Sequence, residues 1–407
     1  MRGDFSRFWI GETVSNFGTS MTQFAIPLLV FKLTGSAVLL GGTAALAGLP
    51  HLLFGLVIGA WSDRLDRKRL MIGVDIVSAV ILASIPLAAA AGVLSIGWIY
   101  LALFASTTIY IFFETAQFAA IPSLVGRDEL VAANGRIQAS FATAAILGPL
   151  VGGALLFFVS VEDLLYVDAA TFLISAVTLS LVRRPFNAPG TRARTTVRAD
   201  ILEGLRYVLR HPVLRNISAM MALINLVSTT VVAQLVLFAK VRFAASDSEI
   251  GALFAAGGVG VVLCSLAAGP LRARFSFGNV ALGALMASGV ATIGLAFAPT
   301  FAAAVVLAAT TAGLATLFNI NTGSLRQAIV PERLLGRILS VAMVLAWSAS
   351  PLGALTGGVI VERTGNITLV YAAIGAIVFA IALYFRVASP LGHAEDFLTA
   401  PATAEAG

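Results

Sequence analysis

Residues 59–69 read Gly59-Ala-Trp-Ser-Asp-Arg-Leu-Asp-Arg-Lys-Arg69, and this short charged stretch decides the fold. Apolar sequence long enough for a spanning helix lies on both sides of it. Four cations and two carboxylates are too costly to place in hydrocarbon, so the stretch is a tight loop at a membrane face. Because cytoplasmic loops retain Lys and Arg, we expect this loop to face the cytoplasm.

The composition of the whole chain supports a membrane protein. Of its 407 residues, 59% are hydrophobic and only 11% are charged, whereas a soluble domain carries about 25% charged residues. The net charge of +6 comes from cations scattered in short loops, so we attribute it to membrane orientation and expect no nucleic-acid partner. The single cysteine, Cys264, excludes a disulfide framework. We interpret the N-terminus as a retained first helix, not a signal peptide.

A spanning helix needs roughly 20 mostly apolar residues, and this rule predicts an all-α protein with twelve spans. With the N-terminus inside, all but four of the 26 Lys and Arg residues fall in cytoplasmic segments. The exceptions are Lys32, Lys240, Arg242 and Arg363. This partition predicts a multi-pass protein of the cell membrane with both termini in the cytoplasm. The expected spans are 8–31, 37–60, 70–91, 97–119, 136–159, 164–182, 216–239, 249–270, 277–297, 301–323, 338–361 and 367–386.

The longest polar segment, residues 183–215, is expected to be a cytoplasmic linker. Within it, Asp200 to His211 has the pattern of an amphipathic helix lying at the inner membrane surface. The linker separates an N-terminal six-helix bundle, residues 1–182, from a C-terminal six-helix bundle, residues 216–388. The remaining tail, residues 389–407, is small and polar, and we expect it to be disordered.

The two halves of the chain resemble each other. A Gly-Arg-Ile sequence at Arg136 precedes Pro149 by 13 residues, and a second one at Arg337 precedes Pro351 by 14 residues. Glycine pairs follow each proline. Such repeats are typical of transporters in which two pseudo-symmetric bundles are related by an axis along the membrane normal, with a substrate path between them.

Three motifs resemble those of a known family. The pattern Gly59-x-x-x-Asp63-Arg64-x-x-Arg67-Lys68 resembles the loop signature of the major facilitator superfamily, although Asp66 stands where the general pattern has Gly. Gly148-Pro149-x-x-Gly152-Gly153 resembles the signature of its drug antiporters. The stretch 168–175 and the segment 200–212 are similar to the branch that holds macrolide-efflux proteins and enterobactin exporters.

The resemblance implies roles for two groups of residues. It assigns Gly59, Asp63, Arg64, Arg67 and Lys68 to a conformational latch between the two halves, closed when the protein opens outward. The alternative is that these charges only fix topology. It assigns Arg136, Gly148, Pro149, Gly152 and Gly153 to a helix that acts as a seal or pivot in antiport, and the alternative is ordinary close packing.

Carboxylates inside the membrane are costly, which makes them functional candidates. We expect Glu12 in the first span or Glu114 in the fourth to carry the coupling proton, because a low-dielectric cavity favours a protonated carboxyl group. We expect structural roles for Asp168 and Asp75, the latter paired with a loop arginine such as Arg136.

Polar side chains recur at helical spacing on four spans and could line one wet cavity. The alternative is interhelical hydrogen bonding that only holds the helices together. The substrate-cavity candidates are Asn16, Gln23, Gln117, Asn225, Asn319 and Asn321.

The sequence contains no phosphate-binding loop, no metal-ligand spacing and no nucleophile–base arrangement. We therefore expect no enzyme, no metal and no cofactor. The predicted function is secondary active export of amphiphilic small molecules of drug, macrolide or siderophore type, by proton antiport and alternating access, with the protein working as a monomer in the lipid bilayer. The alternatives are an uptake or facilitative transporter of the same fold, and a non-transporting receptor or assembly protein.

Overall fold

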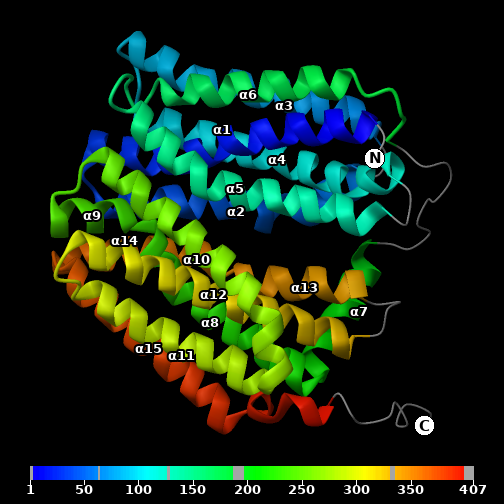
Figure 1. Ribbon diagram of the computed structural model, residues 1–407, viewed down its shortest axis with the longest axis vertical. Coiled ribbons are helices and arrows are strands. Elements are labelled where there is room, and N and C mark those ends of the chain that lie inside the picture. Colours follow the sequence, from blue (N-terminus) through cyan, green and yellow to red (C-terminus); the bar gives the residue numbers. More distant parts are fainter. Residues whose placement is uncertain (1–2, 63–64, 126–128, 187–196, 331–334, 398–407) are drawn as a thin grey trace. The chain divides into compact units, whose positions relative to one another are not determined.

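The computed structural model describes residues 3–62, 65–125, 129–186, 197–330 and 335–397, and every regular element in these ranges is helical (Figure 1). The all-α prediction is therefore confirmed. The helices are α1 (Gly3–Thr34), α2 (Ala37–Ser62), α3 (Arg67–Ala90), α4 (Ile96–Leu124), α5 (Leu130–Leu155), α6 (Leu164–Ser180), α7 (Val197–Arg210), α8 (Pro212–Ala233), α9 (Leu235–Phe243), α10 (Asp247–Arg274), α11 (Phe277–Ala296), α12 (Phe301–Ile329), α13 (Leu335–Trp347), α14 (Ser350–Thr364), α15 (Ile367–Ala388) and the 3₁₀ segment η3 (Pro390–Phe397).

The helices agree with twelve membrane crossings. Ten segments of the described chain are long and apolar enough to cross a bilayer. The apolar α6 has 17 residues, and α1 has 32 residues and carries several charged side chains, among them Asp4 and Arg7. Together these account for the predicted count.

Two expected spans are each divided into two helices. Span seven breaks at Gln234, between α8 and α9, where the buried side chain donates a hydrogen bond from Nε2 to the carbonyl oxygen of Ala37 at 2.7 Å. Span eleven breaks between α13 and α14, where Pro351 stands in the first turn of α14. A proline suits a helix start because it has no N–H to contribute to the helix interior.

The chain folds into two compact units. The first contains residues 1–193 and 233–258, and the second contains residues 194–232 and 259–407. The C-terminal half of the sequence therefore contributes α9 and the beginning of α10 to the first unit. The bundle boundaries expected from the sequence stay a prediction.

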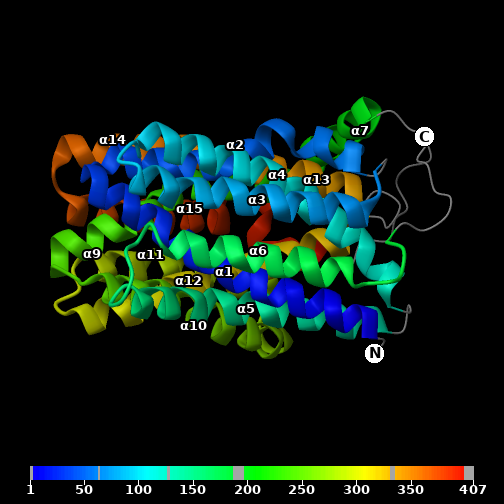
Figure 2. The same ribbon diagram turned by 90° about the horizontal axis from the view of Figure 1, so that it is seen from above.

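In the first unit, α1 lies against α5 and α6, and α3 lies against α4 and α6. These five helices run side by side in Figures 1 and 2. Phe5 and Phe8 at the start of α1 and Met71 in α3 are fully buried, and they pack with Phe186. Their burial fixes one end of α1 against its neighbours and so positions the polar side chains farther along it.

In the second unit, α11 packs against α12 and α15. A Cβ atom added at Gly289 would lie 2.6 Å from the carbonyl oxygen of Gly375, so α11 and α15 are in backbone contact there. Small residues allow such close approach between membrane helices.

The amphipathic helix expected at 200–211 corresponds to α7. It packs on α13, with Val208 buried beside Leu214 and Ile338. His211 follows α7, and its Nδ1 accepts a hydrogen bond from the N–H of Leu214 at 3.4 Å. Burial lowers the pKa of His211, which favours the neutral imidazole that can accept this bond.

Candidate functional site

A cluster of buried polar side chains lies inside the first unit. It consists of Glu12 on α1, Asp75 on α3, Gln117 on α4 and Ser175 on α6, none of which is more than 6% exposed. Glu12 lies near Asp75 and beside Gln117, and Asp75 lies beside Ser175. We call these four residues the acid cluster.

The polar atoms of the acid cluster are poorly paired. Oε2 of Glu12 and both carboxyl oxygens of Asp75 have no hydrogen-bond partner among the described residues. Nε2 of Gln117 and Oγ of Ser175 are likewise unpaired within that part of the chain, so they lie beside the carboxyl groups without hydrogen-bond geometry. Buried polar groups are normally hydrogen-bonded, and exceptions on this scale call for a functional explanation.

Local sequence explains why α1 presents Glu12 to its neighbours. Gly11 and Gly18 lie on the same helix, and a Cβ atom at either position would overlap α6, at Thr178 and Thr171 respectively. The two glycines therefore allow α1 to approach α6 closely. Between them, Ser15 and Asn16 are buried together with Glu12.

The two proton-carrier candidates have different surroundings. Glu12 is 3% exposed, whereas the side chain of Glu114 is 57% exposed. Glu114 Oε2 lies 3.6 Å from Nε2 of His51, across the contact between α2 and α4. Burial therefore separates the two candidates, since Glu12 is enclosed by protein and Glu114 is not.

The other two carboxylates also differ from each other. Asp168 accepts hydrogen bonds from the hydroxyl groups of Thr22 at 2.5 Å and Thr171 at 3.1 Å, which suits the structural role expected for it. The expected pairing of Asp75 with Arg136 is wrong, because the Asp75 oxygens are buried without a partner among the described residues and Arg136 is exposed. The sequence does not show how deeply α3 places Asp75 inside the unit, because that depth depends on which helices pack around it.

The six substrate-cavity candidates are divided between the two units. In the first unit, Asn16 and Gln117 are buried and Gln23 is exposed. In the second, Asn321 is buried, Asn319 is exposed, and the side-chain amide of Asn225 donates to the carbonyl oxygen of Ala346 at 2.8 Å. Asn225 and Asn321 make hydrogen bonds to helix backbone, whereas Nδ2 of Asn16 is unpaired within the described chain. Their role in binding stays a prediction.

The charged loop is described only in part. Asp63 and Arg64 lie outside the described residues, and Gly59 falls within α2. Lys68 donates hydrogen bonds from Nζ to the carbonyl oxygens of Ser180 and Val182 at 3.0 and 2.6 Å, and Arg67 bonds the carbonyl oxygen of Phe186 at 3.2 Å. These cations therefore provide hydrogen-bond donors for carbonyl groups at and after the C-terminal end of α6, where the helix dipole favours positive charge.

The glycines of the α5 motif permit close contacts on two sides. A Cβ atom at Gly148 would lie 2.5 Å from Cβ of Ser20 on α1. At Gly153 it would lie 3.2 Å from Cα of Ser248, and one at Gly251 would lie 2.5 Å from the carbonyl oxygen of Pro149. Helix α5 thus meets α10 backbone to backbone. The remaining members differ in role, because Gly152 faces Phe24 of α1 and the carbonyl oxygen of Arg136 accepts a hydrogen bond from the Trp9 indole.

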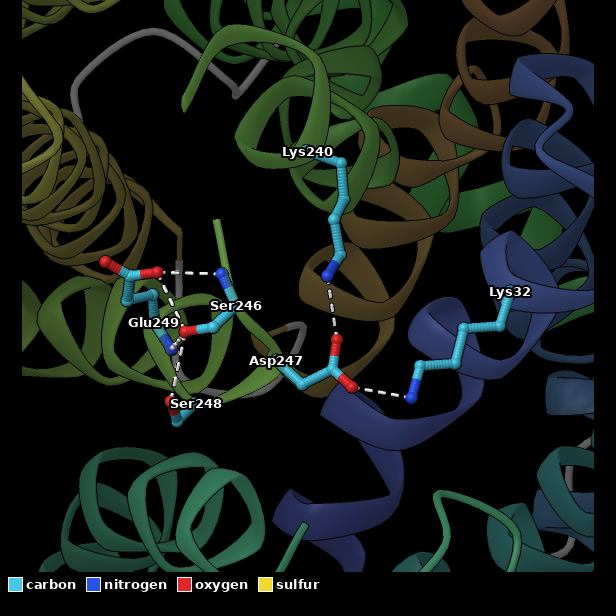
Figure 3. A network of polar contacts seen from close by, with 6 residues as sticks. All are labelled: Lys32, Lys240, Ser246, Asp247, Ser248 and Glu249. Atoms are coloured by element: carbon cyan, nitrogen blue, oxygen red, sulfur yellow. Dashed lines mark hydrogen bonds and ion pairs between the residues drawn. The ribbon is translucent and has the colours of Figure 1, made fainter. Parts of the chain in front are cut away.

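A charged network that hydropathy and motif spacing did not predict lies at the start of α10 (Figure 3). The Asp247 carboxylate binds Nζ of Lys32 at the end of α1 at 2.5 Å and Nζ of Lys240 in α9 at 2.8 Å. We call these three residues the lysine–aspartate network. Its sequence signal was present, because Lys32 and Lys240 are two of the four cations that break the topology rule.

A capping box holds Asp247 in place. Glu249 Oε2 accepts hydrogen bonds from the backbone N–H and the hydroxyl of Ser246 at 2.7 and 2.8 Å, and Ser246 Oγ accepts from the Glu249 N–H at 3.3 Å (Figure 3). This reciprocal pattern is the Ser-x-x-Glu signature of a helix start.

The second unit contains a buried cation that was also missed. Arg326, near the end of α12, is 5% exposed, and its Nη2 lies 3.1 Å from the sulfur of Met221. Its Nε has no hydrogen-bond partner among the described residues. Hydropathy had placed Arg326 in a cytoplasmic segment, just beyond the expected span.

Comparison with known proteins settles the family. The sequence matches the family described as "Transmembrane secretion effector" over residues 2–404. This protein belongs to that family of the major facilitator superfamily. It is 30% identical over 380 residues to the multidrug efflux pump Tap of Mycolicibacterium fortuitum, covering 89% of this chain and 90% of that protein. It is 24% identical over 411 residues to the enterobactin exporter EntS of Salmonella typhimurium, covering 99% and 96%.

A solved structure supports the fold. The nucleoside transporter NupG matches with a TM-score of 0.75 at 15% identity, covering 94% of this chain and 98% of that one. The predicted major facilitator fold is therefore confirmed. The family and the relatives named above confirm that the protein is a transporter and not an enzyme. The protein is a multi-pass membrane transporter of the efflux type that acts on small molecules.

Proposed function

We propose that this protein exports amphiphilic small molecules of drug, macrolide or siderophore type from the cytoplasm in exchange for inward-moving protons. The observation that carries the proposal is Glu12, a carboxyl group buried in the first membrane helix of an efflux-type transporter. One of its oxygens has no hydrogen-bond partner in the described part of the chain. An unpaired buried charge costs several kcal/mol, so such a group is most stable when it holds a proton. A carboxyl group that holds a proton when buried and releases it when exposed to water can couple proton flow to transport.

Between the two candidates, the geometry favours Glu12 as the proton carrier. Glu114 is exposed and faces His51, so conformational change alters its solvation less. The relatives support export, because their names describe a multidrug efflux pump and an enterobactin exporter. The distribution of Lys and Arg supports an orientation in the plasma membrane with both termini in the cytoplasm, and we propose that the protein works as a monomer.

Transport by alternating access requires contacts that break and re-form. Within the first unit, helices from the two halves of the sequence meet at several points. Two of these contacts involve α10: α5 meets it at Gly153 and Gly251, and the lysine–aspartate network links it to α1. Since Lys32 and Lys240 belong to the predicted outer loops, we infer that both contacts close the outer end and separate when it opens. In that state Asp63 and Arg64 would form the predicted latch on the cytoplasmic side.

The test is transport in proteoliposomes. Wild-type protein should accumulate erythromycin or a lipophilic cationic dye when a proton gradient is imposed, and collapse of the gradient with an ionophore should stop it. Glu12→Gln should abolish gradient-driven accumulation, and Glu114→Gln should retain most of it. Accumulation that ignores the proton gradient would favour facilitative transport, and no transport of any compound in a broad panel would favour a receptor or assembly role.

A further inference from the structure

Glu12 has a neighbour of the same kind. Asp75 is 1% exposed, and it comes from α3, which the proposed function does not otherwise use. The two carboxyl groups lie near each other within the acid cluster. Among the described residues, no Lys, Arg or His forms an ion pair with either of them.

The neighbours of this pair are neutral or of the same charge. Gln117 and Ser175 contribute an amide and a hydroxyl. Tyr110 on α4 lies near Glu12, Asp75 and Glu114. Two carboxylates that share a site without a cation cannot both ionise at moderate cost, so the protons of such a pair belong to both groups.

We propose that Glu12 and Asp75 form one proton-binding unit, in which Asp75 is as necessary for coupling as Glu12. This inference rests on the proposed function and deepens it. In the loaded form both carboxyl groups are protonated and the pair is neutral. In the unloaded form one proton has passed to water, and the remaining proton is shared between the two groups, which leaves a single negative charge. One proton is therefore exchanged for each cycle of the pair.

The unpaired atoms around the pair fit this exchange. Nε2 of Gln117 and the hydroxyl of Ser175 are donors that lack partners among the described residues. A donor beside a carboxyl group is available to bind the carboxylate oxygen that appears when the proton leaves. Asp168, in the same unit, differs from the pair because the hydroxyl groups of Thr22 and Thr171 already donate hydrogen bonds to it. It is therefore the matched control.

Infrared titration of the purified protein in lipid tests the pairing without any substrate. The carboxylic C=O band of Glu12 would be followed against pH in wild type, Asp75→Asn and Asp168→Asn, with Glu12→Gln used to identify the band. Coupling within the pair predicts that Asp75→Asn moves the titration midpoint of Glu12 by more than about one pH unit, and that Asp168→Asn leaves it in place. An unchanged midpoint in Asp75→Asn, or an equal change in Asp168→Asn, would overturn the pairing.

Transport assays test its consequence. Asp75→Asn should lose proton-driven accumulation while still exchanging labelled for unlabelled erythromycin across the membrane, and Glu12→Gln should behave in the same way. The double variant should be no worse than either single variant, because the two groups act as a unit. Proton-driven accumulation at the wild-type rate in Asp75→Asn would refute the inference. If wild type itself shows no proton-driven transport while the titrations are coupled, the proposed function fails and the pairing stands.

Discussion

Three buried carboxyl groups among the described residues of the first unit show that hydrogen-bond partners decide the role of a residue. Asp168 is 1% exposed, as Asp75 is, yet two threonine hydroxyls donate to it. A donor pair of this kind satisfies the carboxyl oxygens and fixes the packing of α1 on α6, whereas neither oxygen of Asp75 accepts a hydrogen bond from a described residue. Residue type and burial alone would not distinguish the structural Asp168 from the unpaired Asp75.

Thr22→Val tests the structural part. The substitution keeps the shape of the side chain but removes the donor to Asp168, leaving a buried oxygen unpaired. We expect a loss of stability of about 1–3 kcal/mol, seen as a lower melting temperature in detergent. Thr143→Val is the control, because Thr143 is exposed and, among the described residues, its hydroxyl bonds the carbonyl oxygen of Ala139 on its own helix. Equal melting temperatures for the two variants would contradict a structural role for Asp168.

At the scale of helices, the contact between α5 and α10 depends on the absence of side chains. We expect Gly251→Ala to force these helices apart, because the new Cβ would lie 2.5 Å from the backbone oxygen of Pro149. Overpacking of this kind costs typically about 1–3 kcal/mol. Thermal unfolding measures this cost, with Gly283→Ala as control, since a Cβ at Gly283 would have no described atom of another element within 4 Å. A Gly251→Ala protein as stable as the control would show that the contact between α5 and α10 is not close-packed.

The lysine–aspartate network offers a second test at this scale. Asp247→Asn removes the charge that holds Lys32 and Lys240 together, so hydrogen–deuterium exchange should increase at the end of α1 and the start of α10. Added salt should raise exchange in wild type toward the level of the variant, because it screens partly exposed ion pairs. Asp163→Asn serves as control, since the described residues show Asp163 bonded to Ser160 and to no lysine. Unaltered exchange in Asp247→Asn would mean that the lysine–aspartate network does not hold the end of α1 against the start of α10.

At the scale of the whole molecule, the sequence was enough for the fold because hydropathy and loop charge are averaged over many residues. No single residue decides a span, so the expected count survived the presence of Asp4, Arg7 and Glu12 in α1. Hydropathy did not predict the helix breaks at Gln234 and before Pro351, because apolar sequence continues on both sides of each break. Local packing sets such breaks, and hydropathy does not record packing.

The candidate site was less predictable, because it depends on which helices become neighbours. Helical spacing placed Glu12 and Asn16 on one face of α1, and both are buried. Spacing within α4 could not tell that Gln117 turns toward Glu12 while Glu114, three residues earlier, is exposed and lies beside His51. The partner of Asp75 was wrongly expected in a loop for the same reason. Arg326 was assigned by its position in the sequence, whereas α12 continues past it to Ile329 and buries it.

The central claim is that substrate and protons move in opposite directions through this protein, and a reversal experiment tests it most directly. Proteoliposomes that trap a pH-sensitive dye are loaded with erythromycin and diluted into substrate-free medium, without any imposed proton gradient. Antiport predicts that outward flow of erythromycin drives protons inward, so the lumen acidifies in wild type and not in Glu12→Gln. A lumen that becomes alkaline as erythromycin leaves, or that keeps its pH, would contradict antiport.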